Sequence, residues 1–180
     1  MTLGEMKKKV LSLIEEIDTN QTSLTNDPDI EAKLPHVINQ IQNELARMKK
    51  INAMTSKAVE ENETLDLTTL DKFYQLNIII SSVDYNSVEQ FITFLADGIA
   101  DIYYYKYPTT IDENTEDSFK FELSQDALEI MPYGVAADLL KSDVSNGYGQ
   151  IYAQRYREML QTLDPRYNLG SISFEGGIDV

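Results

Sequence analysis

The fold is decided at the stretch Ser124–Asp143, which reads SQDALEIMPYGVAADLLKSD and joins a β-rich middle to a helical remainder. Ser124 is a favourable N-cap residue. Behind it, apolar residues recur at the spacing of one helix face, at Ala127, Leu128, Met131, Val135, Leu139 and Leu140. Pro132 lies inside this pattern and removes a backbone donor, so the sequence predicts either a kink or a short turn followed by a new helix. The small residues Gly134, Ala136 and Ala137 favour close packing of a neighbouring helix over a bend that faces a ligand.

Two amphipathic stretches come before the middle of the chain. Thr2 and Glu5 form a capping-box pattern at the start of a helix predicted over residues 3–18. Asp27–Pro28 predicts a short helical turn, and Pro35 opens a further helix that continues to about residue 51. His36 follows Pro35; because the chain has one histidine and no cysteine, a solvated or internally satisfied side chain is favoured over a metal ligand.

From Asn52 the residue pattern becomes typical of strands. Strands are expected within residues 57–70 and at 73–80, 88–95, 99–107 and 119–123. Residues 81–87 are interpreted as a turn, and Asp97–Gly98 as a hairpin turn. Because alternating strands bury one face each, this small antiparallel β module must supply its own core.

The last part of the chain is predicted to be one helix followed by an extended arm. The helix covers residues 149–163, and Asp164–Pro165 ends it. The stretch from Arg166 to Val180 is too short to fold alone, so we expect it either to fray or to dock on a neighbour by strand addition or groove binding. Its apolar residues are the candidate partner contacts: Tyr167, Leu169, Ile172, Phe174, Ile178 and Val180.

The predicted fold class is therefore α+β, with about four to five helices in a bundle and an inserted small antiparallel β module. The expected parts are N-terminal helices in residues 1–52, an acidic β module in 53–123, C-terminal helices in 124–163, and the arm in 164–180.

Amino-acid composition limits the classes of function that this protein can have. The chain of 180 residues is 42% hydrophobic, with 11 Tyr and 6 Phe, which is typical of a folded domain. Its net charge is −15, and residues 53–123 carry 4 basic and 14 acidic side chains. This acidic charge argues against nucleic-acid binding through neutralisation of the phosphates. Base stacking is also disfavoured, because few cations lie around the tyrosines that could stack, Tyr103, Tyr104, Tyr105 and Tyr107. With no run of membrane length, and with Glu15–Glu16 interrupting the apolar start, we expect a soluble protein made in a cytoplasm.

No catalytic, cofactor or metal site is predicted. The adjacent acidic pairs, such as Glu60–Glu61, do not face a common point, whereas acid–base catalysis needs carboxylates made unequal by burial. The acidic run that starts at Asp27 lacks the glycine and the final acid of a calcium loop, since Ala32 and Ile38 stand at those places. The sequence therefore favours a protein that is not an enzyme.

An ordered succession of elements carries a family resemblance. The runs IYYYKYPTTI (102–111), FKFELSQDALEIMPYGVAADLLKSD (119–143), YGQIYAQRYREMLQTLDPR (148–166) and ISFEGGIDV (172–180) resemble head–tail connector (adaptor) proteins of tailed bacteriophages that infect Gram-positive bacteria. The resemblance covers Leu76–Val180 well and the N-terminal helices more loosely.

The resemblance implies a virion structural protein of the neck between capsid and tail. It implies a ring of about twelve copies beneath the portal protein, which continues the DNA channel towards the tail. The implied partners are the portal and the next neck or tail-completion protein, and DNA passes through without specific binding.

The sequence also allows a reading of another class. A monomeric acidic regulator or DNA mimic would bind a basic partner through the charged module. Such binding would depend strongly on salt, because exposed charges are screened within about 8 Å at physiological ionic strength. Assembly of a ring would depend more on burial of the helices and the arm.

Overall fold

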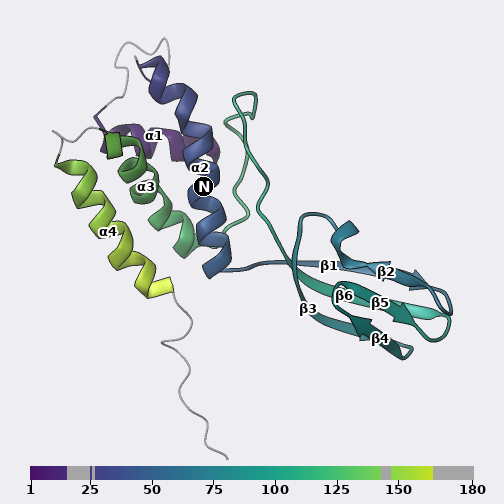
Figure 1. Ribbon diagram of the computed structural model, residues 1–180. Helices are drawn as coiled ribbons and strands as arrows, with labels where there is room; N and C mark the ends of the chain where they lie inside the picture. Colours follow the sequence, from purple (N-terminus) through teal and green to yellow (C-terminus); the bar gives the residue numbers. More distant parts are fainter. Residues whose placement is uncertain (16–24, 26, 143–146, 164–180) are drawn as a thin grey trace, which may run out of the picture.

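The chain is a mixed α+β protein. We describe it from a computed structural model that covers residues 1–15, 25, 27–142 and 147–163. Within these residues there are four α-helices and two three-stranded antiparallel sheets (Figure 1). Figure 1 shows the helices on one side of the molecule and the strands on the other. We call these parts the helical lobe, which includes the segment 107–123, and the β lobe, Ile51–Lys106.

The first helix, α1 (Leu3–Leu13), begins as the sequence predicts. The Glu5 amide donates to Thr2 Oγ1 over 3.2 Å, and the Thr2 amide donates to Glu5 Oε2 over 2.8 Å, so the capping box is confirmed. The predicted end at residue 18 is wrong, because the helix stops at Leu13 and Glu15 has a φ of 61°, which an α-helix cannot continue.

The second helix, α2 (Pro28–Met48), is longer than predicted. Asp27 is the N-cap, and its carboxylate accepts hydrogen bonds from the amides of Asp29 and Ile30. The prediction of a separate helix opening at Pro35 is wrong, because Pro35 lies inside α2. One buried face continues across it, through Leu34, Pro35, Ile38, Ile41, Gln42 and Leu45. This continuous burial offsets the one backbone hydrogen bond that Pro35 cannot make.

The third helix, α3 (Gln125–Leu139), contains the stretch that anchors the sequence pattern. It passes through Pro132 without starting a new helix there, so that alternative is wrong. Ser124 is its N-cap by position, but the Ser124 side chain makes no capping hydrogen bond, and its buried Oγ has no hydrogen-bond partner among the described residues. A short 3₁₀ turn, η2 (Leu140–Ser142), follows α3.

Close packing joins α3 to the last helix, α4 (Tyr148–Leu163). A Cβ atom added at Gly134 would lie 2.8 Å from Cε2 of the Tyr156 ring, which is closer than van der Waals contact allows. The predicted close approach of a neighbouring helix at Gly134 is therefore confirmed.

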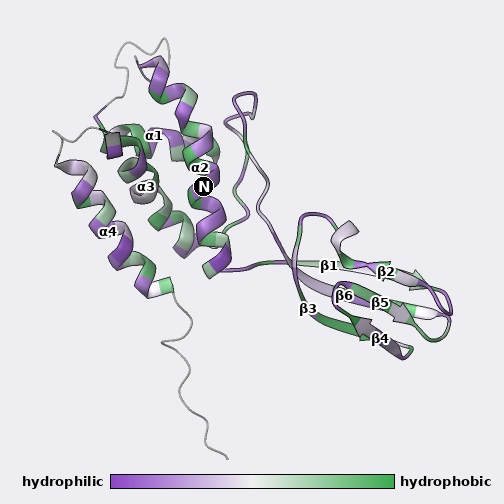
Figure 2. Ribbon diagram, in the orientation of Figure 1, coloured by the Kyte–Doolittle hydropathy of each residue, from purple (hydrophilic) through white to green (hydrophobic). Residues whose placement is uncertain are grey.

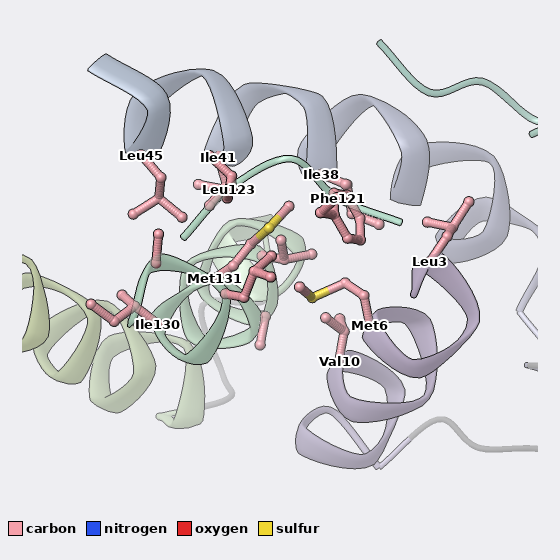
Figure 3. Close-up of a cluster of buried hydrophobic side chains, with 14 of the residues drawn as sticks. Leu3, Met6, Val10, Ile38, Ile41, Leu45, Phe121, Leu123, Ile130 and Met131 are labelled. Carbon is pink, nitrogen blue, oxygen red and sulfur yellow. The ribbon is translucent and has the colours of Figure 1, made fainter. Parts of the chain in front are cut away.

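The helical core gathers side chains from α1, α2, α3 and the segment before α3 (Figure 3). Phe121 and Leu123 point into this core beside Ile38, Ile41 and Met131. The prediction of a strand over residues 119–123 is wrong, since only one isolated bridge forms there, between Thr2 and Lys120.

The segment before α3 instead closes the start of α1. The Leu3 amide donates to the Phe119 carbonyl over 2.8 Å, and the Gly4 amide donates to the Asp117 carbonyl over 3.0 Å. These bonds satisfy amides that have no partner within the helix.

The β lobe contains two sheets. In the first, β1 (Ile51–Val59), β6 (Gly98–Lys106) and β3 (Phe73–Ser81) are arranged in the order β1-β6-β3. In the second, β2 (Thr64–Asp66), β5 (Phe91–Phe94) and β4 (Tyr85–Val88) are arranged in the order β2-β5-β4. A 3₁₀ turn, η1 (Leu67–Thr69), follows β2.

The two sheets share a core that is separate from the helical core. Its buried members come from both sheets and from η1: Val59, Leu65, Leu67, Ile79, Ile92, Phe94, Ala100, Ile102 and Tyr104. The last strand ends at Lys106, and Ile111, Phe121 and Leu123 belong to the helical core. The boundary expected at residue 123 thus lies beyond the last strand.

Of the two turns predicted in the β lobe, the one over residues 81–87 is right only at 82–84, between β3 and β4, and the hairpin turn at Asp97–Gly98 is wrong. Strand β4 occupies part of the turn predicted over residues 81–87, and a φ of 53° at Glu89 turns the chain between β4 and β5. Asp97–Gly98 is not a hairpin turn, because the strands it connects, β5 and β6, belong to different sheets. Gly98 is needed for close approach, since a Cβ atom there would lie 2.6 Å from Val83 Cγ1.

Candidate interaction surfaces

The described residues contain no group of three or more His, Asp or Glu side chains placed to hold a metal ion. His36 is exposed, as are the acidic pairs Glu60–Glu61, Asp112–Glu113 and Glu116–Asp117. No helix in the described part of the chain has the length and apolar character needed to cross a bilayer.

The arm residues named from the sequence lie outside the described residues. Tyr167, Leu169, Ile172, Phe174, Ile178 and Val180 all fall in the segment 164–180. The two surfaces described next come from other parts of the chain, and the sequence analysis did not identify them.

The first surface is the side of the β1-β6-β3 sheet that faces away from the β-lobe core. Along β6, Ala100, Ile102 and Tyr104 are buried in that core. Successive side chains of a strand point to opposite faces, so Ile99, Asp101, Tyr103 and Tyr105 point outward. We call this side the outer sheet face.

The strand register places more apolar side chains on the outer sheet face. Met54 and Ile78 flank Tyr103 on the two neighbouring strands, and Ile80 lies opposite Asp101. The exposed fractions of Met54, Ile78, Ile80 and Ile99 are 54%, 53%, 57% and 59%. Large apolar side chains so exposed and so close together are typical of a protein-binding surface.

Part of β3 is apolar on both faces. An antiparallel sheet with one face in water normally alternates apolar and polar residues, whereas a sheet covered on both sides has continuous apolar runs. Ile78–Ile79–Ile80 in β3 is such a run, and Figure 2 colours much of β3 as hydrophobic. We infer that the outer sheet face is built to be covered.

A single carboxylate lies within this apolar surface. Asp101 is half-buried between Ser56 and Ile80 on the neighbouring strands, with Ile99 and Tyr103 two positions away along β6. Within the described residues, its carboxylate has no hydrogen-bond or ion-pair partner. A protein that covers this face must supply a donor, because a carboxylate buried without one is strongly destabilising.

The tyrosines of β6 and its continuation do not form a common stacking platform. Tyr104 points into the β-lobe core, where its hydroxyl donates to the Asp71 carbonyl over 3.3 Å. Lys50 Nζ lies 4.4 Å from the centre of the Tyr105 ring on the other face, and Tyr107 packs against Tyr74.

The second surface lies on the helical lobe. Tyr148 and Ile151 of α4 are 54% and 58% exposed, and Arg155 follows on the same side of the helix, at the spacing of one helix face. The Arg155 guanidinium carbon lies 4.5 Å from the centre of the Tyr133 ring.

A shallow groove adjoins this side of α4. Its volume is about 420 Å³, and its lining includes Lys8, Lys9, Leu13, Pro132, Tyr133 and one carboxylate, that of Glu129. Tyr152 donates from its hydroxyl to the Leu13 carbonyl over 2.8 Å and so ties α4 to α1. We call the groove together with Tyr148, Ile151 and Arg155 the α1–α4 face.

Polar interactions at the junction between the two lobes, where β6 ends, hold the lobes together. One Glu122 oxygen pairs with Lys106, and the other accepts hydrogen bonds of 2.9 Å from the amide and the hydroxyl of Thr109. Burial alone would raise the pKa of Glu122, but the hydrogen bonds from Lys106 and Thr109 outweigh it and lower the pKa below its ordinary value of 4.5.

Two side-chain amides of α2 hold the chain just after β6, at Thr109 and Ile111. The buried Gln42 donates to the Thr109 carbonyl over 3.0 Å. Asn39 donates to the Ile111 carbonyl over 2.7 Å and accepts from the Ile111 amide over 2.9 Å. These bonds fix the chain where it returns from β6 to the helices.

Comparison of the sequence with protein-family models and with curated proteins found no match.

Proposed function

We propose that this protein is a structural protein of the virion neck, a head–tail connector and not an enzyme. In this proposal the helices form a bundle with an inserted β module, and copies assemble as a ring below the portal that extends the DNA channel towards the tail. The resemblance of Leu76–Val180 to phage adaptor proteins supports this assignment.

The outer sheet face is the observation that carries the proposal. Its apolar side chains, with Met54, Ile78, Ile80 and Ile99 each more than half exposed, match the composition of the centre of a protein–protein interface. A connector needs at least one such surface for each neighbour in the assembly. A ring in which the β lobe of each copy contacts another protein would use this face.

The charge of the chain fits a wall around passing DNA. Residues 53–123 have a net charge of −10, and clustered cations are what tight binding to phosphates requires. An acidic lining would leave DNA free to slide. The β lobe, with 3 basic and 9 acidic side chains in residues 51–106, is well suited to such a wall.

The composition of the outer sheet face makes a DNA mimic the weaker candidate. A mimic of nucleic acid presents rows of negative charge to a basic partner. The outer sheet face instead presents one carboxylate, Asp101, among apolar side chains. Binding through this face would survive high salt, whereas binding through charge alone would not.

Native mass spectrometry of the full chain with a portal ring from the same genome tests the proposal. We expect a complex with about one copy per portal subunit at two salt concentrations. A portal ring from an unrelated genome is the control and should not bind. A chain that remains monomeric beside its own portal at both salt concentrations would contradict the connector assignment.

A further inference from the structure

We infer that the outer sheet face of one copy binds the α1–α4 face of a second copy. The inference deepens the proposed ring and rests on it for its biological setting. It names the two surfaces that meet and the charge pair at their centre, Asp101 of one copy and Arg155 of the next.

The two faces match in chemistry. The outer sheet face has one carboxylate surrounded by Ile80, Ile99 and Tyr103. The α1–α4 face has an exposed guanidinium beside the apolar side chains of Ile151 and Tyr148. Arg155 would supply the donor that Asp101 needs when the sheet is covered, and the apolar residues around each charge would exclude water from the pair.

The wider charges also match. The β lobe is acidic, with 3 basic and 9 acidic side chains in residues 51–106. The α1–α4 face carries the cations Lys8, Lys9 and Arg155, together with the carboxylates of Glu129 in the groove, Glu15 near Tyr152 and Glu158 one turn after Arg155. The cations attract the acidic β lobe, whereas two β lobes would repel each other.

The arrangement of the lobes makes the contact intermolecular. Figure 1 shows α4 at the end of the helical lobe that is farther from the strands, with α2 and α3 between them. A single chain therefore cannot bring Arg155 to its own Asp101. A contact between two different faces is heterologous, and repeated contacts of this kind close into a ring when the rotation between copies allows it.

Two sheet faces packed on each other would satisfy Asp101 less well. When the two copies of Asp101 face each other, the contact adds no cation beside them, because Lys50, the lysine over the outer sheet face, lies at the Tyr105 ring and not beside Asp101. Like charges placed together in this way are destabilising.

Charge reversal tests the inference through self-association of the full chain. Asp101→Arg and Arg155→Asp each place like charges across the contact, and each is expected to weaken association about tenfold or more in sedimentation velocity over a concentration series. The double variant restores opposite charges and should associate within about threefold of the original chain. An equimolar mixture of the two single variants should also recover, since each then meets a complementary partner.

Matched controls separate this contact from net charge and from folding. Asp84→Arg makes the same charge change at an exposed position of the β lobe and should leave association unchanged. Circular dichroism shows whether Asp101→Arg folds. Arg155→Asp, at an exposed position of α4 outside the helical core, provides the same test with the loss of one surface contact to Tyr133.

Three results would overturn the inference. They are a chain that stays monomeric up to millimolar concentration, single variants that associate like the original chain, and a failure of both the double variant and the mixture to recover. Portal binding distinguishes the two proposals. If the original chain binds portal and both single variants bind it equally well, with no effect on self-association, the connector assignment stands and this inference fails. If the charge pair controls self-association but no form binds portal, the inference stands and the connector assignment fails.

Discussion

The helical lobe and the β lobe use apolar residues in different ways. In the helical lobe, α1 and α2 direct their apolar faces into one core, and Tyr148 and Ile151 are the large apolar side chains that its described helices expose. The β lobe builds a smaller core and still exposes eight large apolar side chains: Met54, Ile78, Ile80, Tyr85, Val88, Phe91, Leu95 and Ile99. Most apolar residues of the helical lobe therefore serve folding, and only Tyr148 and Ile151 of its described helices are left for the binding we propose, whereas the β lobe keeps a larger set of apolar residues for binding.

The largest expected effect comes from removing an apolar side chain of each kind. Ile38 is fully buried in the helical core and Ile78 is 53% exposed on the outer sheet face. Ile38→Ala should lower the free energy of unfolding by about 2–5 kcal/mol, and Ile78→Ala by about 0.5 kcal/mol or less. Urea denaturation of the two variants measures both values. Similar losses at both positions would erase the distinction between a folding residue and a binding residue.

A second substitution asks whether the two cores are stabilised separately. Ile102 is fully buried in the β-lobe core. Ile102→Ala should cost about 2–4 kcal/mol and should raise amide hydrogen exchange in β1, β3 and β6 more than in α2, because the lobes have separate cores. Ile38→Ala is the matched control and should act mainly on the helices. An equal rise in exchange across both lobes would show that they unfold as one unit.

Some features of the fold were predictable from the sequence, and others were not. The helix starts at Thr2 and Asp27 and the close packing at Gly134 were predictable, because caps and small residues act on near neighbours. Residues 119–123 alternate like a strand, yet Phe121 and Leu123 pack between helices, since their partners are distant in sequence. Periodicity reports local alternation and does not report which element will cover a face.

The sequence contains a signal for the outer sheet face that residue periodicity alone does not reveal. The run of three isoleucines in β3 and the apolar residues on both sides of Asp101 in β6 are typical of strands covered on both faces. Recognising the surface also required the strand order β1-β6-β3, which sets Met54 and Ile78 beside Tyr103. That order depends on long-range pairing, and the predicted hairpin at Asp97–Gly98 would have given a different one.

A smaller effect is expected within the helical lobe at Gly134. In Gly134→Ala, the added Cβ would press on the Tyr156 ring. Overpacking of this kind costs about 1–3 kcal/mol, and the better helix propensity of alanine offsets about 1 kcal/mol. We expect a net loss of about 1 kcal/mol in thermal or urea unfolding. Gly147→Ala is the control, because nothing lies within 4 Å of its added Cβ. Equal stability of the two variants would contradict the close contact between α3 and α4.

The smallest expected effect is at the junction between the lobes. Glu122→Gln removes the ion pair with Lys106 and should lower stability at pH 7 by about 1 kcal/mol, because the pair is only partly shielded from solvent. Glu113→Gln, at an exposed position, is the control and should have little effect.

The stability contributed by the junction between the lobes depends on pH with a definite sign. The pKa of Glu122 is lower in the folded chain than its ordinary value of 4.5, so its contribution is present above that pH and is lost as the pH falls through the lowered value. The hydrogen bond to Glu122 raises the pKa of Lys106 above 10.5, so that contribution is lost as the pH rises through the raised value. Unfolding curves from pH 2 to 6 should converge for Glu122→Gln and the original chain at the acid end. Curves that stay parallel would contradict a role for the Glu122 charge.

The most direct measurement of the central claim is methyl NMR of the full chain with labelled isoleucines. We predict that signals of Ile78, Ile80 and Ile99 shift or broaden as protein concentration rises or when the portal ring is added. Signals of Ile92 and Ile102, which are fully buried in the β-lobe core, should stay in place. Outer-face isoleucines that keep their dilute-solution signals under both conditions would contradict the claim that the outer sheet face is a binding surface.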